Sequence, residues 1–324
     1  MQMKEITYKE ALREAMVEEM RRDEDIIFLG EDIGVYGGGF GVSYGMIEEF
    51  GEERVRDTPI SEAAIAGCAA GAAATGLRTI MEIMFSDFIT IAMDVIVNQA
   101  AKMRYMFGGK VQVPMVVRCP GGSGTGAAAQ HSQCLEAWMC HIPGLKVVAP
   151  STPADAKGLL KAAIRDNNPV IFYENKLLYK TTGLVPTEDY VIELGKANIT
   201  KEGSDITVVT YGRMLERCEK ASEILKVQGI DAEIIDLRTL YPMDKETIIK
   251  SVCKTGRALI VHEASKTGEI SASIVESEAF DYLKAPIKRL AGKDVPIPYN
   301  PQLEKAVVPD TDEIVEEIKS LINR

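Results

Sequence analysis

Residues 145–173, LKVVAPSTPADAKGLLKAAIRDNNPVIFY, contain the pattern that decides the fold. The apolar run Leu145–Ala149 predicts a buried strand. Thr152, with proline as the next residue, predicts the start of a helix that runs to about Arg165, since Thr caps a helix and Pro fits its first turn. A second apolar run, Val170–Tyr173, predicts another strand. This strand–helix–strand order is typical of a parallel sheet covered by helices.

The same alternation extends toward the N-terminus of the chain. Thr7 and Glu10 have capping-box spacing and predict the first helix. Apolar stretches and helix caps predict strands at Ile26–Leu29, Val55–Ile60, Leu77–Phe85 and Pro114–Cys119, and helices at Tyr44–Phe50, Ala63–Thr75 and Asp87–Phe107. We expect residues 1–186 to form a doubly wound α/β domain with a largely parallel sheet.

A segment rich in Gly, Pro and charge predicts a linker at residues 187–204, after which the alternation restarts. The predicted strands are Ile206–Tyr211, Glu233–Leu237, Ala258–His262 and Ile287–Ala291, and the predicted helices are Leu215–Val227, Lys245–Lys254 and Thr311–Ile322. We expect residues 205–324 to form a second, smaller doubly wound domain. The predicted fold class is therefore α/β with two doubly wound domains.

Composition excludes several classes of protein. The formal charge of -11 argues against nucleic acid as a partner, because binding to phosphates depends on Lys and Arg. The most membrane-like stretch, Ile89–Val97, is short and interrupted by Asp94, so it predicts a buried helix rather than a membrane span. Six scattered cysteines without a C-x-x-C pair indicate reduced thiols, and the N-terminus has no apolar signal core. We expect a cytoplasmic protein.

Two residues stand out as candidates for chemistry. His131 follows a run of small residues, GGSGTGAAAQ, after a predicted strand, where ligands of open α/β sheets bind. A structural role and a ligand-facing role explain His131 equally well. Glu62 lies at the start of the predicted helix Ala63–Thr75, where complementing the helix dipole is the simpler explanation of a carboxylate. That helix has almost no side-chain bulk, which predicts close approach of another backbone at a subunit interface.

Seven segments resemble the beta chains of thiamine-dependent pyruvate, branched-chain 2-oxo acid and acetoin dehydrogenases. They are GEDIGVYGG, RVRDTPISEAAIAG, MEIMFSDF, AAKMRYMFGG, AAQHSQCLEAW, PGLKVVAPSTPADAKGLLKAAIRDNNPVIFYE and APIKRLAG, and they span nearly the whole chain. The resemblance implies a thiamine-diphosphate pyrimidine-binding domain followed by a transketolase-like C-terminal domain. It also implies the beta subunit of an enzyme that transfers an acyl group to a lipoyl domain.

The resemblance assigns roles to individual residues. Glu62 matches the carboxylate that hydrogen-bonds the aminopyrimidine nitrogen of thiamine diphosphate, and His131 matches a histidine that faces the substrate. Met84 and Phe88 match positions that line the pyrimidine pocket, with Ile60 nearby. A potassium ion held mostly by main-chain carbonyls is also implied, at Met115, Ala163, Ile164, Asp166 and Asn168.

The sequence departs from self-contained thiamine enzymes in one motif. Those enzymes hold the diphosphate and magnesium with a GDG motif, and no GDG occurs in these 324 residues. Where the family splits the enzyme, the motif lies on an alpha chain. The resemblance therefore implies two alpha and two beta chains, with magnesium held by alpha and a lipoyl acyltransferase core as a further partner. A self-contained thiamine enzyme and a non-catalytic docking module are the alternatives.

The substrate is predicted from two positions and two segments. The apolar Met84 and the hydroxyl-free Phe88 point away from branched-chain acids, whose enzymes place Gln and an aromatic hydroxyl there. AAKMRYMFGGKVQVP and AAQHSQCLEAW look most like acetoin dehydrogenase beta chains, and pyruvate enzymes share much of both. We therefore predict acetoin, with pyruvate as the alternative. The segment near Gly268 looks shorter than in typical relatives.

Overall fold

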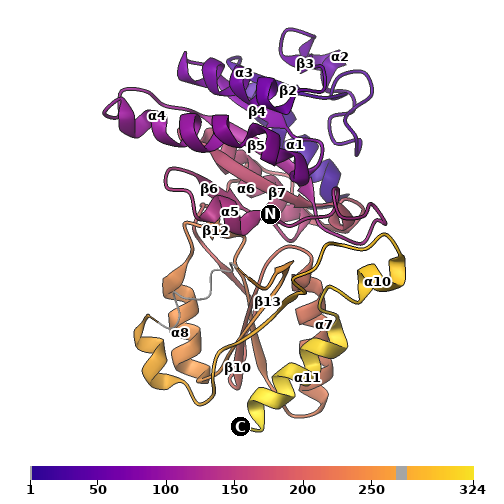
Figure 1. Cartoon of the computed structure of the whole chain (residues 1–324), viewed down its shortest axis with the longest axis vertical. Coiled ribbons are helices and arrows are strands. Elements are labelled where there is room, and N and C mark those ends of the chain that lie inside the picture. Colours follow the sequence, from indigo (N-terminus) through magenta and orange to yellow (C-terminus); the bar gives the residue numbers. More distant parts are fainter. Residues whose placement is uncertain (1, 268–275) are drawn as a thin grey trace.

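The structure is a computed structural model that describes residues 2–267 and 276–324. Two lobes lie one above the other, and each is built on its own sheet with helices on both faces (Figure 1). The first sheet has seven strands and the second has five, and most neighbouring strands in each are parallel. The predicted fold class, α/β with two doubly wound sheets, is confirmed.

The first sheet includes a strand from the second half of the sequence. In spatial order its strands are β12 (Thr239–Tyr241), β6 (Lys146–Val148), β7 (Val170–Asn175), β5 (Met115–Gly121), β4 (Arg78–Glu82), β2 (Ile26–Gly30) and β3 (Val55–Asp57). All neighbours are parallel except β12, which is antiparallel to β6. The lobes are therefore joined by sheet hydrogen bonds as well as by the chain. The boundaries 1–186 and 205–324 remain a prediction.

Helices cover both faces of the first sheet, and the predicted caps are confirmed. On one face α1 (Tyr8–Arg22) packs against α6 (Pro153–Arg165), and on the other lies α3 (Glu62–Ala74). Thr7 and Glu10 form the capping box of α1, and the Thr152 hydroxyl accepts a hydrogen bond from the Asp155 N–H at the start of α6. Two short helices, α2 (Met46–Phe50) and α5 (Glu136–Cys140), complete the lobe.

The prediction of one long α-helix over Asp87–Phe107 was wrong in its hydrogen-bond register. The chain is helical there, but it forms a 3-10 segment η1 (Ser86–Ala92), a π-helical segment η2 (Asp94–Ala100) and a short α4 (Ala101–Met106). Apolar periodicity does not distinguish these registers, because their side-chain spacings are similar over a few residues. Tight and wide turns of this kind are frequent at functional sites.

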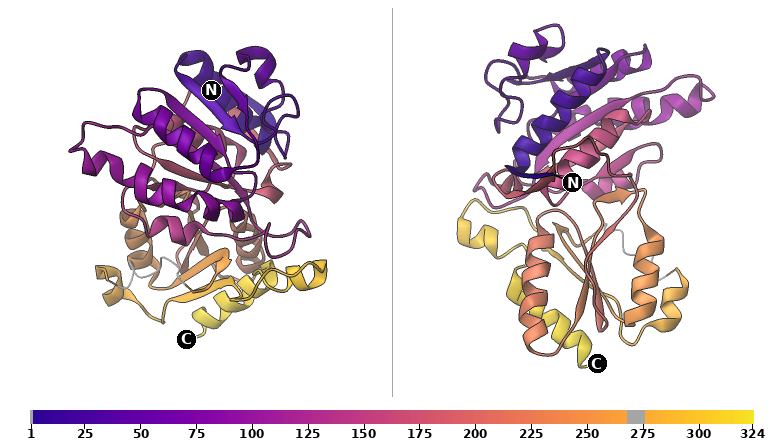
Figure 2. Two further views of the ribbon diagram at one scale, coloured as in Figure 1. Left: turned by 45° about the horizontal axis from the view of Figure 1, so that its top comes forward. Right: turned by 180° about the vertical axis from the view of Figure 1, so that it is seen from behind.

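The second lobe is a five-stranded sheet between helices. In spatial order its strands are β14 (Lys288–Gly292), β13 (Ala258–Ser265), β10 (Ile206–Thr210), β11 (Ala232–Asp236) and β9 (Asn198–Lys201), the last antiparallel to its neighbour. Helices α7 (Met214–Val227) and α11 (Thr311–Ile322) cover one face, and α8 (Lys245–Thr255) covers the other (Figure 2). Part of the predicted linker thus forms β9, because its backbone completes the sheet edge.

The remaining described elements are short. They are the antiparallel pair β1 (Met3–Thr7) and β8 (Thr182–Pro186), the 3-10 turns η3 (Lys176–Leu178) and η4 (Glu278–Tyr282), and α10 (Pro301–Lys305). The segment near Gly268 that looked short in sequence falls in 268–275, outside the described residues. Among the described helices, none has the length and apolar character needed to cross a bilayer.

Candidate active site at the edge of the first sheet

Four adjacent strands of the first sheet deliver the candidate residues to one edge. The carboxyl end of β2 is followed by Glu31, that of β3 by Glu62, that of β4 by Met84, and that of β5 by the loop that carries His131. We call residues 122–135, between β5 and α5, the His131 loop. The carboxyl edge of a parallel sheet is where ligands of open α/β folds bind, so this edge is the candidate active site.

Two buried carboxylates, Glu62 and Glu31, lie close to each other at this edge. Glu62 is the first residue of α3, is only 5% exposed, and makes no hydrogen bond or ion pair with the described residues. Glu31 is also buried, and its Oε1 has no hydrogen-bond partner there. Burial, together with the negative charge of Glu62, raises the pKa of Glu31. Since buried carboxylates are normally hydrogen-bonded, this pair fits a ligand that offers polar hydrogens.

Met84 and Ile60 supply apolar surface beside the carboxylates. A Cβ added to Gly39 would lie 3.3 Å from the Met84 side chain, so the backbone of the glycine-rich loop after β2 passes closely over Met84. Ile60 follows β3 and is 83% exposed. An apolar side chain this exposed next to a carboxylate pair can cover the flat face of a heterocyclic ligand or meet another chain.

His131 belongs to an aromatic cluster with Phe85 and Phe88. Its ring centroid lies 4.6 Å from that of Phe85 and 5.2 Å from that of Phe88, and both contacts are edge-to-face. The Lys176 ammonium donates a hydrogen bond to the His131 carbonyl and lies over the Phe85 ring. These contacts hold the imidazole on the aromatic side of the site, next to the Phe88 position that the sequence predicted.

Hydrogen bonds fix the residues that follow His131 to η1. The Asp87 carboxylate accepts hydrogen bonds from the Gln133 backbone N–H (3.2 Å) and side-chain amide (2.9 Å), and the Ser86 hydroxyl donates to the Gln133 carbonyl (3.0 Å). Ser86 and Asp87, which make these contacts, are the first two residues of the 3-10 segment η1. Glu62 and His131 thus share the sheet edge, and hydrogen bonds fix the segment that carries His131.

A cleft of about 630 Å³ separates the lobes beside the His131 loop. Its walls include residues 132–135 of the loop and residues 292–297 of the second lobe. His262, by contrast, is buried in the second lobe and stacks on Tyr211, and burial lowers its pKa to about 4. His262 is therefore part of the packing between strands and not of the candidate site.

Three contributors were missed by sequence reasoning. Phe85, Lys176 and Glu31 all contact or face the candidate residues, but none was singled out. Glu31 lies two residues after a predicted strand, as Glu62 does, and that position could have marked it. Lys176 also lies just after a predicted strand, but its contact with His131 had no local signal, because the two residues are 45 positions apart in the sequence.

The carbonyls implied as potassium ligands lie at the end of α6 and at the start of β5 (Met115). The Arg78 guanidinium donates to the carbonyls of Ile164 (3.1 Å) and Asp166 (3.2 Å), and the Ala163 carbonyl accepts from the Asp166 N–H. Helix C-termini carry partial negative charge, so this cluster suits a cation, and a carbonyl oxygen has a second lone pair to offer. The side-chain oxygen of Asn168 accepts a hydrogen bond from Arg104. The main-chain carbonyl of Asn168 takes no part in that contact.

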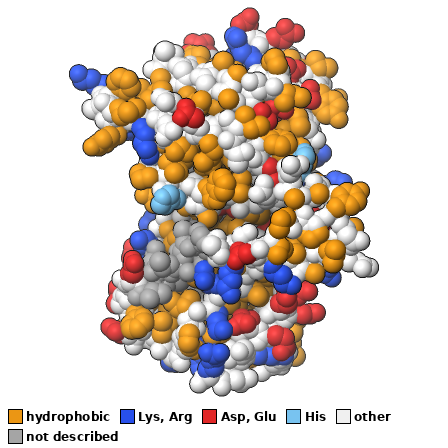
Figure 3. Space-filling view, in the orientation of Figure 1, with side chains coloured by type: hydrophobic (Ala, Val, Ile, Leu, Met, Phe, Trp, Pro, Cys, Tyr) orange, Lys and Arg blue, Asp and Glu red, His pale blue; other side chains and the backbone are white. Residues whose placement is uncertain are grey.

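The outer face of α3 is bare. Apart from the backbone of α3 itself, no atom of the described residues lies within 4 Å of where a Cβ would stand on Gly67 or Gly71, and Ala63, Ala64 and Cys68 are exposed. Hydrophobic side chains are spread over this lobe and over the junction between the lobes (Figure 3). The bare face of α3 is the surface on which the sequence predicts another backbone.

Comparisons with known proteins agree with this architecture. Residues 4–182 match the family described as transketolase, pyrimidine binding domain, and residues 195–314 match transketolase, C-terminal domain. A solved structure described as a split gene transketolase, inactive beta4 tetramer, superposes with a TM-score of 0.81 over 98% of this chain and 99% of that chain. Its sequence is 22% identical, so it supports the fold alone.

Curated relatives are much closer in sequence. The pyruvate dehydrogenase E1 component subunit beta of Rhizobium meliloti is 52% identical over 99% of this chain and 70% of the relative. The 2-oxoisovalerate dehydrogenase subunit beta of Bacillus subtilis is 49% identical over 98% of this chain and 99% of the relative. The acetoin:2,6-dichlorophenolindophenol oxidoreductase subunit beta of B. subtilis is 46% identical over 96% and 95%. The chain therefore belongs to the family of beta subunits of the thiamine-diphosphate-dependent component of 2-oxo acid dehydrogenase-type complexes.

Proposed function

We propose that this chain supplies the pyrimidine-binding half of a thiamine-diphosphate active site and is catalytic only with an alpha subunit. The observation that carries the proposal is the buried pair Glu62 and Glu31, which has no cation or hydrogen-bond donor within the described residues to satisfy it. A donor from the aminopyrimidine would meet that need. The exposed Ile60 and the half-buried Met84 would lie beside the ring.

Each residue then has a distinct task. Thiamine diphosphate, when bound, supplies a nucleophilic carbon that adds to a carbonyl substrate. Glu62 holds a proton at the pyrimidine nitrogen, which strengthens the neighbouring amine as a base. His131, fixed against Phe85 and Phe88, faces the substrate and orients its oxygen or the acyl acceptor. Phe88 excludes water from that side of the site.

The partners follow from what the sequence lacks. We expect an alpha subunit with the GDG motif to hold the diphosphate and magnesium, in an assembly of two alpha and two beta chains. The bare face of α3 and the exposed Ile60 support contact with other chains. The carbonyl cluster around Ala163, Ile164 and Asp166, with Met115 and Asn168, remains the proposed potassium site. A lipoyl acyltransferase core, reached in the cytoplasm, remains the proposed acyl acceptor.

The substrate is a small acyl donor, either acetoin or pyruvate. The apolar Met84 against Gly39 supports acetoin or pyruvate over a branched-chain acid. The sequence segments favour acetoin, whereas the relative at 52% identity is a pyruvate dehydrogenase subunit, which favours the alternative. Identities to pyruvate, 2-oxoisovalerate and acetoin enzymes lie between 46% and 52%, so overall similarity does not separate the substrates.

The assembled alpha–beta enzyme tests the proposal directly. Acetoin, pyruvate and 3-methyl-2-oxobutanoate are compared in parallel with an artificial electron acceptor, with and without thiamine diphosphate. We expect cofactor-dependent turnover of acetoin or pyruvate. A preference for the branched acid would show that Met84 was misinterpreted, and no cofactor-dependent turnover of any of the three would contradict the catalytic proposal itself.

A further inference from the structure

The His131 loop has little structure of its own. Gly122, Gly124 and Gly126 have φ values of +85°, +99° and +69°, and Ala128 has +61°, so the backbone repeatedly enters the left-handed region. The contacts of its backbone N–H groups within the loop are few and long, such as His131 N–H to the Ala128 carbonyl at 3.4 Å. A loop of this composition is flexible unless other parts of the protein hold it.

One carboxylate of the second lobe holds two glycines of this loop, Gly124 and Gly126. Glu304 lies in α10 and is 4% exposed. Its Oε1 accepts a hydrogen bond from the Gly124 N–H at 2.6 Å, and its Oε2 accepts one from the Gly126 N–H at 3.1 Å. Within the described residues no Lys or Arg forms an ion pair with Glu304. The buried charge is therefore balanced mainly by the loop itself.

The helix that carries Glu304 is built to hold it in place. The Asn300 side chain accepts hydrogen bonds from the N–H groups of Gln302 (2.9 Å) and Leu303 (3.3 Å), and a proline follows it in the first turn. Asn300 thus caps α10, which is only five residues long and would otherwise fray. The Asn300 cap stabilises the short helix whose Glu304 carboxylate bonds to the loop.

A second attachment fixes the beginning of the loop. Glu263 accepts from the Ser123 N–H (2.6 Å) and hydroxyl (2.7 Å), and Arg213 donates to the Ser123 carbonyl (3.0 Å) while pairing with Glu263 (2.9 Å). At the other end, Lys176 donates to the His131 carbonyl. The Glu263 carboxylate also bonds to Asn175 and Arg213, which lie outside the loop. Among the described residues, the hydrogen bonds of the Glu304 carboxylate go only to the loop. Glu304 is therefore the residue whose substitution isolates the effect on the loop.

We propose that Glu304 is a positioning residue of the active site, through which the second lobe fixes the His131 loop and thereby the imidazole of His131. The inference rests on the proposed role of His131. It assigns the second lobe a task inside the site of the first lobe. A shift of α10 would move Gly124 and Gly126, and through them the histidine, by a distance that matters for a reacting group.

Glu304→Gln is the sharpest test, because it keeps the shape and changes only one oxygen. A carboxamide has one acceptor oxygen, so one glycine N–H would face the NH₂ group instead of an acceptor. In the assembled alpha–beta enzyme we expect amide hydrogen exchange at Gly124 and Gly126 to rise about tenfold or more. We expect kcat for acyl transfer to fall about 10- to 100-fold, with KM and cofactor affinity changed less than about twofold.

The matched control is Glu313→Gln. It replaces the carboxylate that accepts from the Asp310 N–H in the capping box of the neighbouring α11, does not touch the loop, and should leave loop exchange and kcat unchanged. The double variant His131→Ala with Glu304→Gln should be no slower than His131→Ala alone, because both act through one group. Additive losses in the double variant, or normal loop exchange in Glu304→Gln, would overturn the inference.

Two further results separate this inference from the proposed function. Full activity of His131→Ala would overturn the proposed role of His131, whereas loop exchange in Glu304→Gln reports on the attachment alone. If Glu304→Gln does not assemble, Asn300→Ala loosens α10 with Glu304 intact. We expect about fivefold faster exchange at Gly124 and a matching loss of kcat, and no change in either would equally overturn the proposal.

Discussion

Glu62 is a buried carboxylate that receives no hydrogen bond from the described residues around it. Its place at the start of α3 provides a favourable helix dipole, but the described residues offer it no hydrogen-bond donor, and Glu31 adds a second negative charge nearby. Two buried carboxylates without a cation cost stability, so their retention at the sheet edge suits a ligand more than a structural role. Helix capping alone does not require that Glu62 be buried.

Glu62→Gln separates these two roles. The amide keeps the shape but does not support the proton at the pyrimidine nitrogen, so hydrogen–deuterium exchange at the thiazolium carbon of the bound cofactor should slow by about two to four orders of magnitude. Assembly with the alpha subunit should be unaffected. The exchange rate is measured by NMR after acid quench of the assembled variant. A rate near that of the wild type would reassign Glu62 to helix capping.

Glu136 is another buried carboxylate, and it lies outside the candidate site. It is the first residue of α5 and lines a cavity of about 30 Å³ between the lobes, enough for a water molecule, together with Tyr173. Its Oε2 and the Tyr173 hydroxyl have no hydrogen-bond partner among the described residues. Burial raises the pKa of Glu136 to about 7. The folded protein therefore keeps a proton that the unfolded chain releases near pH 4.5.

Glu136 thus makes stability fall as pH rises from about 4.5 to 7, because over that range the unfolded state binds fewer protons than the folded state. Glu136→Gln removes this dependence. Its free energy of unfolding relative to the wild type should improve by up to about 3 kcal/mol between pH 4.5 and pH 8. Urea unfolding across this range measures it, with the exposed Glu52→Gln as control. A difference that does not vary with pH would contradict the prediction.

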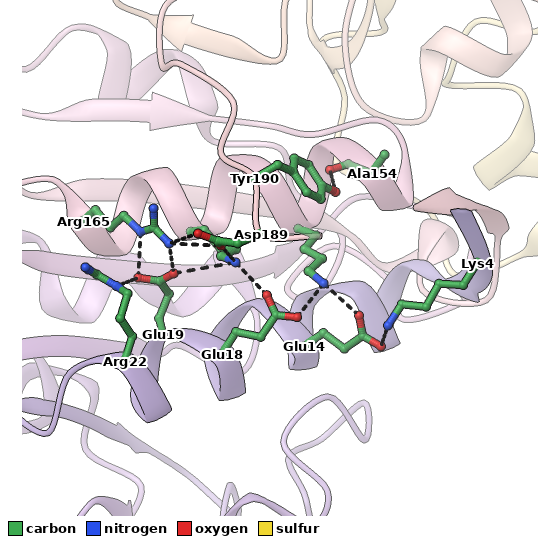
Figure 4. A network of polar contacts seen from close by, with 11 residues as sticks. Lys4, Glu14, Glu18, Glu19, Arg22, Ala154, Arg165, Asp189 and Tyr190 are labelled. Carbon is green, nitrogen blue, oxygen red and sulfur yellow. Dashed lines mark hydrogen bonds and ion pairs between the residues drawn. The ribbon is translucent and has the colours of Figure 1, made fainter. Parts of the chain in front are cut away.

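At the scale of elements, α1 and α6 are joined by a network of ion pairs (Figure 4). Glu18 on α1 pairs with Lys157 (2.7 Å) and Lys161 (2.6 Å) on α6, and both lysine side chains are at most 1% exposed. Lys161 also pairs with Asp189, which lies beyond β8. The network therefore fixes the segment that leads to the second lobe against the first lobe.

Substitution of Glu18 tests how much the network stabilises the protein. Partial burial raises the pKa of Glu18, but hydrogen bonds from Lys157 and Lys161 outweigh it and lower the pKa overall. Glu18→Gln should lower the free energy of unfolding by about 1–2 kcal/mol at pH 7, since two buried lysines each lose a charged partner. The difference should shrink as pH falls below about 4.5, where Glu18 is protonated in the unfolded chain, and disappear only below its lowered pKa in the folded protein.

Glu316→Gln is the control for this experiment. Glu316 pairs with Lys319 at 3.4 Å on the exposed side of α11, and exposed pairs contribute little. Unfolding in urea at pH 7 and at pH 3.5 is compared for both variants. Equal effects of Glu18→Gln and Glu316→Gln would show that the α1–α6 network adds nothing beyond surface charge.

At the scale of the whole molecule, the chain has a pyrimidine binding domain and no GDG motif for the diphosphate. We expect the purified chain to bind thiamine diphosphate negligibly, even with magnesium, and the alpha–beta mixture to bind it tightly. The reason is that an acidic chain of net charge -11 offers no group suited to the anionic end of the cofactor. Titration calorimetry on both samples measures this. Tight binding by the chain alone would contradict the half-site proposal.

The sequence by itself determined the local elements and the fold class. Thr7 with Glu10 and Thr152 with Pro153 marked the starts of α1 and α6, and the apolar run Val170–Tyr173 marked β7, because caps and periodicity act over a few residues. It also placed Glu62 and His131 after strands. Their assignment to a site came from the resemblance, and their catalytic roles remain predictions.

Only the tertiary structure decided how distant segments meet. β12 leaves the second half of the chain to pair with β6, and Glu304 reaches Gly124 across 180 positions. The 3-10 turn of η1 lies where Ser86 and Asp87 bond to Gln133, 46 to 47 positions along the chain. Hydrogen bonds between distant residues form only once the whole fold brings those residues together. A local sequence pattern contains no information about partners that lie far along the chain.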